Sequence, residues 1–286
     1  MATAIAAPAE DHERTVCATV AYDGTDYHGF QAQPNALSIQ QALEEGLDRF
    51  GERSSRVIGA GRTDAGVHAS GQVVAVHLKW RHTVTALQRA WNVHLPPAIV
   101  VRDVQDAPAE FHPRFSAVSR TYRYTVRCGG QQGSKAAVTR SPLTDRFAWF
   151  EARPLDVSAM NLVSESLVGR HDFATFGQPP QGENTVRTIL QAEWVWVEES
   201  VAPLTDFQGQ RLIFTITADA FLRQMVRSLV GALLAVGRGE WTPKRFAAAW
   251  AAADRSRAVK PAAPQGLVLE KVTYPAYLDM LVFGKE

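Results

Sequence analysis

The sequence has almost no cysteine, and this scarcity excludes two common kinds of stabilisation. Its 286 residues contain only Cys17 and Cys128, with no Cys-x-x-Cys pair. Two isolated cysteines indicate neither a disulfide framework nor a zinc site. We therefore expect no metal, and this cysteine usage fits the reducing cytoplasm.

Long apolar runs are also missing. No stretch approaches the roughly 20 consecutive apolar residues that a membrane-spanning helix needs. The first 14 residues carry acidic side chains where a secretory signal would have a basic start and an apolar core. We expect no association with a membrane, and we interpret residues 1–14 as a disordered tail.

The chain has little net charge. The formal value is +1 at pH 7, so overall charge gives no argument for a nucleic-acid partner, which usually requires a basic excess. Hydrophobic residues make up 46% of the sequence, which is enough to fill sizeable cores in a chain of this length. The composition is that of a globular protein with one large domain or two ordinary ones.

The hydrophobic pattern of the first half predicts a β-α-β-β-α-β unit. Alternating apolar residues predict a strand that ends near Tyr22, and Ser38 with Gln41 forms a capping-box pattern before an amphipathic helix. The remaining predicted elements are a short strand at 56–59, a strand at 72–78, a helix at 85–93 and a strand at 98–104. This order is that of a ferredoxin-like unit.

The second half repeats this order without obvious sequence identity. The predicted elements are strands at 120–127, 188–197, 211–217 and 267–274, a helix at 157–168 and a long helix at 220–236. An extra helix, with Thr242 as its N-cap and Pro243 in its first turn, precedes the last strand.

Two such units in tandem predict an α+β fold. We expect an N-terminal ferredoxin-like half at residues 15–115 and a C-terminal half at residues 116–286. Joined edge to edge, they would form one large, mostly antiparallel sheet with helices on one face and a central cleft.

The segment GAGRTDAGVHASGQVVAVHL, residues 59–78, places charged side chains in a glycine-rich loop just before a strand. It lacks the third glycine of a dinucleotide-binding loop and the Gly-Lys-Ser/Thr of a P-loop, and no long helix follows it. Asp64 is the candidate for chemistry in this loop, with Arg62 as its cationic neighbour. The alternative is that Asp64 only caps the turn at residues 65–67.

Arg227 stands in the strongly apolar helix AFLRQMVRSLVGALLAVG. Removing a guanidinium from water costs several kcal/mol unless a carboxylate receives it, so Arg227 is expected to have an anionic partner. A carboxylate that meets such an arginine has its charged form favoured. The alternatives are a purely structural ion pair, or an Arg227 side chain that extends to solvent.

Two tyrosines alternate with arginines in EFHPRFSAVSRTYRYTVR. Tyr122 and Tyr124 fall on one face of the predicted strand, and Arg123 and Arg127 fall on the other. Aromatic side chains on a strand with neighbouring arginines suit base stacking and phosphate contact. The alternative is that both tyrosines are core residues with a hydroxyl at the rim.

Six motifs occur in order between about Val16 and Pro275: GAGRTDAGVHASGQV, FHPRFSAVSRTYRY, HDFATF, VRTI, FLRQMVRSLVG and GLVLEKVTYP. In this order and spacing the sequence resembles the tRNA pseudouridine synthase A family, for which GRTDAGVHA is almost diagnostic alone. The resemblance implies an isomerase that converts uridine to pseudouridine at positions 38, 39 and 40 of the tRNA anticodon stem-loop. It also implies a cytoplasmic homodimer that uses no metal or organic cofactor.

The resemblance also implies roles for four residues. Asp64 takes the place of the catalytic aspartate, and Tyr122 that of the tyrosine that stacks on the target uracil. Arg227 matches the basic residue that pairs with the aspartate, and Arg62 matches the arginine thought to help evert the nucleotide. Ser228 departs from the family, which often has asparagine there, and this change is expected to alter hydrogen bonding beside Arg227.

The chemistry leaves three routes open at Asp64. The carboxylate attacks the base, attacks C1′ of the ribose, or captures a glycal formed by deprotonation of the sugar. Two other classes of protein compete with the isomerase. A non-catalytic RNA-binding protein of two ferredoxin-like units does not explain a carboxylate in the loop. A nucleoside or glycoside hydrolase normally needs a second carboxylate, and residues 59–78 contain only one.

Overall fold

The computed structural model describes residues 13–128, 140–179, 182–197 and 210–283. Residues 1–12 of the predicted tail and most of the loop at 129–141 lie outside these ranges. The strands are β1 (Glu13–Tyr22), β2 (Glu52–Arg53), β3 (Ile58–Gly59), β4 (His68–Lys79), β5 (Ile99–Asp106), β6 (Ser119–Cys128), β7 (Trp149–Glu151), β8 (Gly169–Asp172), β9 (Val186–Val197), β10 (Gln210–Ala218) and β11 (Leu267–Thr273). The helices are α1 (Ile39–Asp48), α2 (Val84–Val93), α3 (Val157–Ser166), α4 (Met225–Gly237), α5 (Pro243–Ala251) and α6 (Ala276–Phe283).

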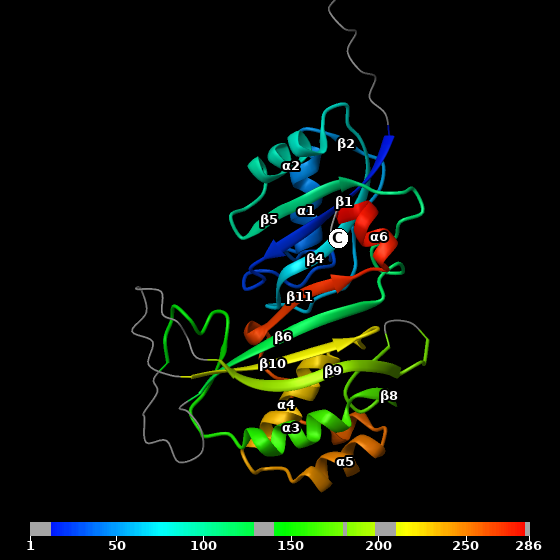
Figure 1. The fold of residues 1–286 in the computed structure, drawn as a ribbon. Coiled ribbons are helices and arrows are strands. Elements are labelled where there is room, and N and C mark those ends of the chain that lie inside the picture. Colours follow the sequence, from blue (N-terminus) through cyan, green and yellow to red (C-terminus); the bar gives the residue numbers. More distant parts are fainter. Residues whose placement is uncertain (1–12, 129–139, 180–181, 198–209, 284–286) are drawn as a thin grey trace, which may run out of the picture.

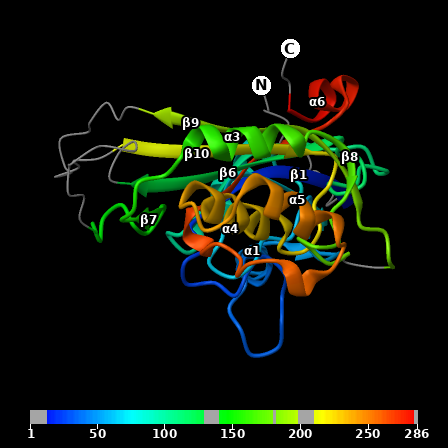
Figure 2. The same cartoon turned by 90° about the horizontal axis from the view of Figure 1, so that it is seen from below.

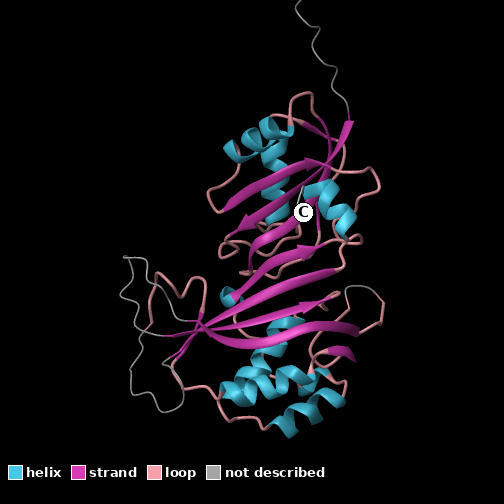
Figure 3. Ribbon diagram, in the orientation of Figure 1, coloured by secondary structure: helices cyan, strands magenta, loops and turns pink. Residues whose placement is uncertain are grey.

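All the strands belong to one sheet that crosses the whole molecule (Figures 1 and 3). They pair in the order β5-β1-β4-β11-β6-β10-β9-β8, with β2 and β3 on β4 and β7 on β6. The pairs are antiparallel except for β11 with β4 and β7 with β6. This architecture confirms the predicted α+β fold with a large, mostly antiparallel sheet.

The two halves of the sheet have the same topology. Numbered by their order along the chain, β1, β3, β4 and β5 lie in the spatial order 4-1-3-2, and so do β6, β9, β10 and β11. The junction is short, because β11 pairs with β4 only through Val268 opposite His68 and Leu269 opposite Ala69. The last strand of the second half therefore joins the halves, whose predicted boundary at residues 115 and 116 stays a prediction.

The helices lie mainly on one face of the sheet. Seen from below, α1, α4 and α5 lie on one side of the strands and α6 lies on the other (Figure 2). The N-caps predicted for two helices are confirmed: the Ser38 side chain accepts from Gln41 N, and the Thr242 side chain accepts from Arg245 N. The sequence pattern did not predict α6 or the short strands β2, β7 and β8.

The largest difference from the predicted elements is the start of α4. The helix begins at Met225, so the prediction of helix over 220–224 is wrong. Gln224 has a positive φ of 63°, which a right-handed helix does not allow, and the backbone of Arg223 pairs with that of Gln178. The chain thus enters α4 through a sharp turn.

Candidate active site

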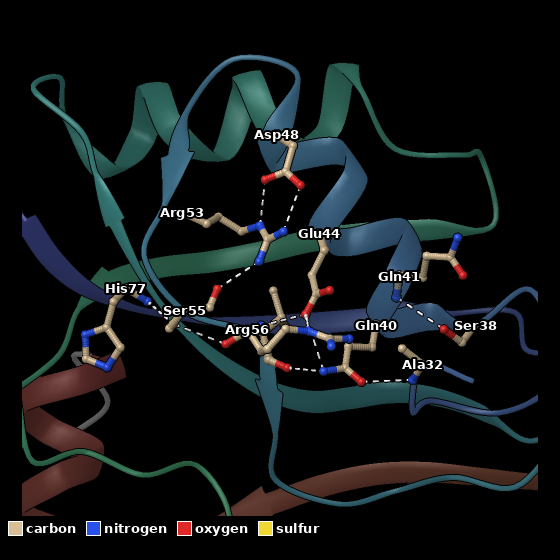
Figure 4. A network of polar contacts seen from close by, with 11 residues as sticks. Ala32, Ser38, Gln40, Gln41, Glu44, Asp48, Arg53, Ser55, Arg56 and His77 are labelled. Carbon is tan, nitrogen blue, oxygen red and sulfur yellow. Dashed lines mark hydrogen bonds and ion pairs between the residues drawn. The ribbon is translucent and has the colours of Figure 1, made fainter. Parts of the chain in front are cut away.

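A polar network from α1 holds the segment that leads into the glycine loop (Figure 4). Gln40 Nε2 donates to Val57 O at 2.8 Å, and Glu44 Oε1 accepts from Val57 N at 2.9 Å. The same carboxylate oxygen accepts from Arg56 Nε at 2.8 Å, and Gln40 Oε1 accepts from Ala32 N at 2.9 Å. Both backbone groups of Val57 are therefore fixed to a helix.

The start of the glycine loop is held against β4. Gln72 makes two hydrogen bonds to Gly61: its Nε2 donates to the carbonyl at 2.7 Å and its Oε1 accepts from the backbone N–H at 3.2 Å. Two residues later, Thr63 O accepts from Phe30 N at 3.1 Å and Thr63 Oγ1 bonds to Tyr22 Oη at 2.8 Å. A loop rich in glycine is thus rigidly placed on both sides of Arg62.

The turn after Asp64 is closed by the backbone and not by the carboxylate. Val67 N donates to Asp64 O at 3.1 Å, and Gly66 adopts a φ of 74°, which favours glycine. Among the described residues, the Asp64 carboxylate accepts no backbone N–H. The alternative in which this side chain caps the turn therefore has no support in the structure.

The Asp64 carboxylate meets Arg227 instead. Arg227 Nη1 lies 3.1 Å from Asp64 Oδ2, and Arg227 Nε donates to Ala262 O at 2.8 Å. The two side chains are 17% and 26% exposed for Arg227 and Asp64, respectively. The pair is therefore half-buried and remains open to a substrate on one side.

Gly231 allows the chain to approach α4 closely enough to orient this arginine. A Cβ at position 231 would lie 2.5 Å from Lys260 O, which is closer than atoms can come. With glycine there, Ala262 N donates to Arg227 O at 2.8 Å, while the Ala262 carbonyl accepts from the guanidinium. The segment at 260–262 thus fixes Arg227 through both its backbone and its side chain.

Tyr122 lies next to this pair, on the face of β6 that it shares with Tyr124. Its ring is buried, meets Phe221 edge to face at 5.2 Å, and its hydroxyl would lie 3.6 Å from a Cβ at position 61. Burial raises the pKa of Tyr122, and the negative charge of Asp64 adds to this effect. The hydroxyl is therefore neutral near pH 7, and it lies beside the loop that carries Asp64.

The structure also gives the environments of Arg62, of Tyr124 and of the two phenylalanines in the motif HDFATF, Phe173 and Phe176. Arg62 is exposed and makes no hydrogen bond or ion pair with any residue that the structure describes. Tyr124 is a core residue whose hydroxyl donates to Ala263 O at 2.9 Å. Phe173 and Phe176 are fully buried and stack on the rings of Trp250 and Phe246, so they serve packing.

Sequence reasoning missed two residues that position the loop, Gln72 and Arg120. Arg120 is buried, and its Nη2 donates to Ala60 O at 3.2 Å, just ahead of Gly61. A signal was present, because residues two apart in a strand share a face and Arg120 precedes Tyr122 by two. In the structure the side chains of Arg120 and Tyr122 both reach the glycine loop, at Ala60 and Gly61.

Neither a metal site nor a membrane span was found among the described residues. In the parts of the chain that the structure describes, no three His, Cys, Asp or Glu side chains gather in a way that would hold a metal ion. No helix in these same parts has the length and apolar character to cross a bilayer.

The fold and the site belong to a known class of enzyme. Residues 18–116 and 163–275 match the sequence profile of the family described as tRNA pseudouridine synthase. The matched residues cover most of the chain and include Asp64 and Arg227 at the point where the halves meet. The profile match over both halves therefore defines the class of protein as a pseudouridine synthase, which is an isomerase.

Curated relatives make the assignment more specific. The chain is 41% identical over 264 residues to tRNA pseudouridine synthase A of Roseiflexus sp. (strain RS-1), covering 92% of this chain and 91% of the relative. It is 40% identical to the protein of the same name from Acidiphilium cryptum (strain JF-5), covering 88% and 93%. The chain belongs to the tRNA pseudouridine synthase A family.

Solved structures add nothing to this assignment. A chain of the structure titled "Crystal Structure of a Cbf5-Nop10-Gar1 Complex" is matched over 70% of this protein and 39% of that chain. The identity is 12% and the TM-score 0.26, a likeness too weak to support an argument.

Proposed function

We propose that this protein converts uridine to pseudouridine at positions 38, 39 and 40 of the tRNA anticodon stem-loop, with Asp64 as the nucleophile. The observation that carries the proposal is the contact between Asp64 and Arg227 beside the buried Tyr122. Family membership supports the reaction class, and the motif around Asp64 supports the choice of substrate position.

The ion pair prepares Asp64 for attack. Arg227 contacts Oδ2, while Oδ1 has no partner among the described residues. The guanidinium is itself held by Ala262 O and fixes the orientation of the carboxylate, so little reorganisation is needed when the substrate arrives. Oδ1 is then available for attack on the base or on C1′, or for capture of a glycal.

The reaction conserves the atoms of the nucleotide. The bond from N1 of uracil to C1′ breaks, the base turns, and a bond from C5 to C1′ forms. C5 then loses its proton to solvent and N1 gains one. The detached base needs a surface to hold it during this exchange, and Tyr122 would supply that surface by stacking.

The target nucleotide must leave its stacked position to reach Asp64, at a cost of roughly a few kcal/mol. Arg62 is suited to fill the vacated space, because its side chain is exposed and free of contacts among the described residues. Arg62 lies two residues before Asp64 in a rigid loop. When Arg62 enters the vacated space, the loop would therefore also bring Asp64 to the flipped uridine.

The family also leads us to expect a cytoplasmic homodimer that acts on tRNA without an organic cofactor or a metal. The loop at 129–141, whose length varies in the family and which could touch RNA, lies outside the described residues up to 139. Whether a dimer builds the RNA-binding groove is tested by measuring the mass of the protein with and without tRNA.

Tritium release tests the proposed reaction directly. Unmodified tRNA labelled at C5 of uridine is incubated with the wild-type protein and with Asp64→Asn. Release by the wild type alone establishes base isomerisation and the role of Asp64. Tight binding by both proteins without release from either would favour the non-catalytic RNA-binding protein. Mapping the modified nucleotides tests positions 38 to 40.

A further inference from the structure

Three arginines beside the active site, Arg114, Arg120 and Arg187, form no ion pair with a carboxylate in the parts of the chain that the structure describes. Arg120 is buried, with an exposed fraction of 8%, yet its guanidinium donates only to backbone carbonyls of the described residues. These include Asp219 O at 2.8 Å, Ala60 O at 3.2 Å and Arg114 O. Carbonyl groups satisfy the N–H donors, but they do not neutralise a buried positive charge.

Asp219 is the acid that acts on this cluster among the described residues, and one of its carboxylate oxygens is already bonded to the backbone. Asp219 Oδ1 accepts from Thr188 N at 3.1 Å and from Ala220 N at 2.6 Å, and Asp219 N donates to Thr188 O at 3.1 Å. Because Arg120 Nη1 donates to Asp219 O, these bonds also bring the backbone of Arg187, the neighbour of Thr188, near the Arg120 guanidinium. One carboxylate, with one oxygen bound to backbone amides, therefore acts on the guanidiniums of both Arg120 and Arg187.

The electrostatics agree with this geometry. Burial lowers the pKa of Arg187; the charge of Arg114 lowers it further, and Asp219 opposes both effects. Burial likewise lowers the pKa of Arg120, where Arg114 again acts in the lowering direction. Each guanidinium therefore experiences the positive charge of a neighbour, which an added anion would relieve.

Arg114 and Arg187 both have N–H groups to spare. Arg114 makes no side-chain hydrogen bond or ion pair with the described residues, and its guanidinium lies 5.5 Å above the ring of the exposed Phe115. Stacking of this kind covers one face of the group and leaves the N–H edge available. Arg187 uses Nη1 for the carbonyls of Asn184 and Val186, and its Nη2 has no partner among the described residues.

We propose that Arg114 and Arg187 together bind one phosphate of the RNA backbone beside the target uridine, with Arg120 as a buried charge behind it. The inference rests on the proposed function and adds a binding site to it. Arg120 places this site next to the catalytic loop, because it bonds to both Arg114 O and Ala60 O. A backbone phosphate offers two non-bridging oxygens, which can accept hydrogen bonds from two guanidiniums.

The salt dependence of tRNA binding tests the site. The logarithm of the association constant for tRNA falls linearly with the logarithm of salt concentration, and each phosphate contact makes this fall steeper by roughly 0.7 to 0.9. The slope below means the magnitude of this fall. Arg114→Gln and Arg187→Gln are each expected to weaken binding about tenfold and to lower this slope by about one. Because both residues would hold the same phosphate, the double variant should show no further fall in slope.

The binding measurement uses the Asp64→Asn background, so that the tRNA stays unmodified. Arg89→Gln is the matched control, since Arg89 is exposed on α2 and lies at the far end of the sheet from β9. It should leave both affinity and slope unchanged. Arg114→Lys should keep the slope and lose part of the affinity, because lysine keeps the charge but not the fork.

The outcomes separate the two proposals. Unchanged affinity and slope in both single glutamine variants would overturn the phosphate site, and so would a double variant whose slope falls by two. Absence of tritium release from wild-type protein would instead overturn the proposed reaction. Thermal unfolding of each variant shows whether a loss of binding comes from a loss of fold.

Discussion

Asp64 and Arg227 lie 163 residues apart in the chain, and their side chains meet at 3.1 Å between Oδ2 and Nη1. The aspartate comes from a loop of the first half, and the arginine comes from a helix of the second. Neither half contains this pair alone. The correct docking of the two halves is therefore a condition for the proposed chemistry.

Replacing the Asp64 carboxylate by an amide should abolish turnover and leave binding intact. Asp64→Asn keeps the shape of the side chain and removes the anion that attacks, so tritium release should fall to background. The affinity for tRNA should change less than about threefold, because the amide still fits beside Arg227. Asp26→Asn, at an exposed carboxylate of a neighbouring loop, is the control and should retain full activity. Appreciable release by Asp64→Asn would refute the nucleophile.

Arg227 should act on the chemical step more than on tRNA binding. Arg227→Gln removes the charge beside Asp64 and is expected to lower kcat by roughly one hundredfold or more. Arg227→Lys keeps the charge but cannot donate to Asp64 and to Ala262 O in the same geometry, so an intermediate loss is expected. Single-turnover rates at saturating tRNA measure the effect. A change confined to Kd would show that Arg227 only binds RNA.

Tyr122 should serve mainly as a stacking surface. Tyr122→Phe keeps the ring against Phe221 and should retain most activity, whereas Tyr122→Ala should lose both activity and about 3 to 5 kcal/mol of stability. The rate of tritium release and the free energy of unfolding are measured on both variants. Equal loss of activity in both would assign the essential role to the hydroxyl.

The pH profile gives an independent check on that hydroxyl. Because burial raises the pKa of Tyr122 above its ordinary value of about 10, the phenol stays protonated through pH 10. Wild-type protein and Tyr122→Phe should therefore show the same alkaline limb below pH 10. A limb present in the wild type and absent from the phenylalanine variant would contradict the assigned protonation state.

Arg62 should matter to activity and not to folding. It makes no hydrogen bond or ion pair with the described residues, so Arg62→Ala should change the melting temperature by less than about 2 °C. Turnover should fall at least tenfold, because no side chain would then fill the space that the flipped nucleotide leaves in the RNA. Substrates with the target uridine already unpaired should rescue part of this loss. No rescue would exclude a role in nucleotide flipping.

The junction between the halves depends on the absence of a side chain at Gly71. A Cβ at Gly71 would lie 2.1 Å from Glu270 O, so Gly71→Ala must push β4 and β11 apart. We expect a loss of about 1 to 3 kcal/mol in the free energy of unfolding, measured by denaturant titration. Gly51→Ala is the control, because its Cβ would meet Leu47 O at an ordinary 3.6 Å. Equal stability of the two variants would show that the junction adapts.

The types of residue and the local periodicity of hydrophobic residues predicted much of the fold and of the candidate site from the sequence. Asp64 was singled out because it is the one carboxylate in the glycine-rich segment 59–78, and Arg227 because an arginine in an apolar helix needs an anionic partner. Period-2 alternation placed Tyr122 and Tyr124 on one face, as the structure confirms. These features are local, so a sequence pattern can contain them.

The features that were missed depend on contacts between distant segments. The start of α4 is set by Gln224, whose left-handed backbone is stabilised by pairing around Gln178 and not by any local helix signal. The role of Arg120 comes from carbonyls contributed by three separate segments. The pairing of β11 with β4 joins strands about 200 residues apart, which local periodicity does not encode.

The central position of β11 affects how the protein is made. This strand lies between β4 and β6, although it follows all the other described strands in the chain. Until residues 267–273 have been synthesised, β4 and β6 have no partner at the middle of the sheet, and Asp64 has no fixed distance to Arg227. A nascent chain can therefore hold every proposed catalytic residue and still lack an active site, so catalytic competence arises only after β11 has been synthesised.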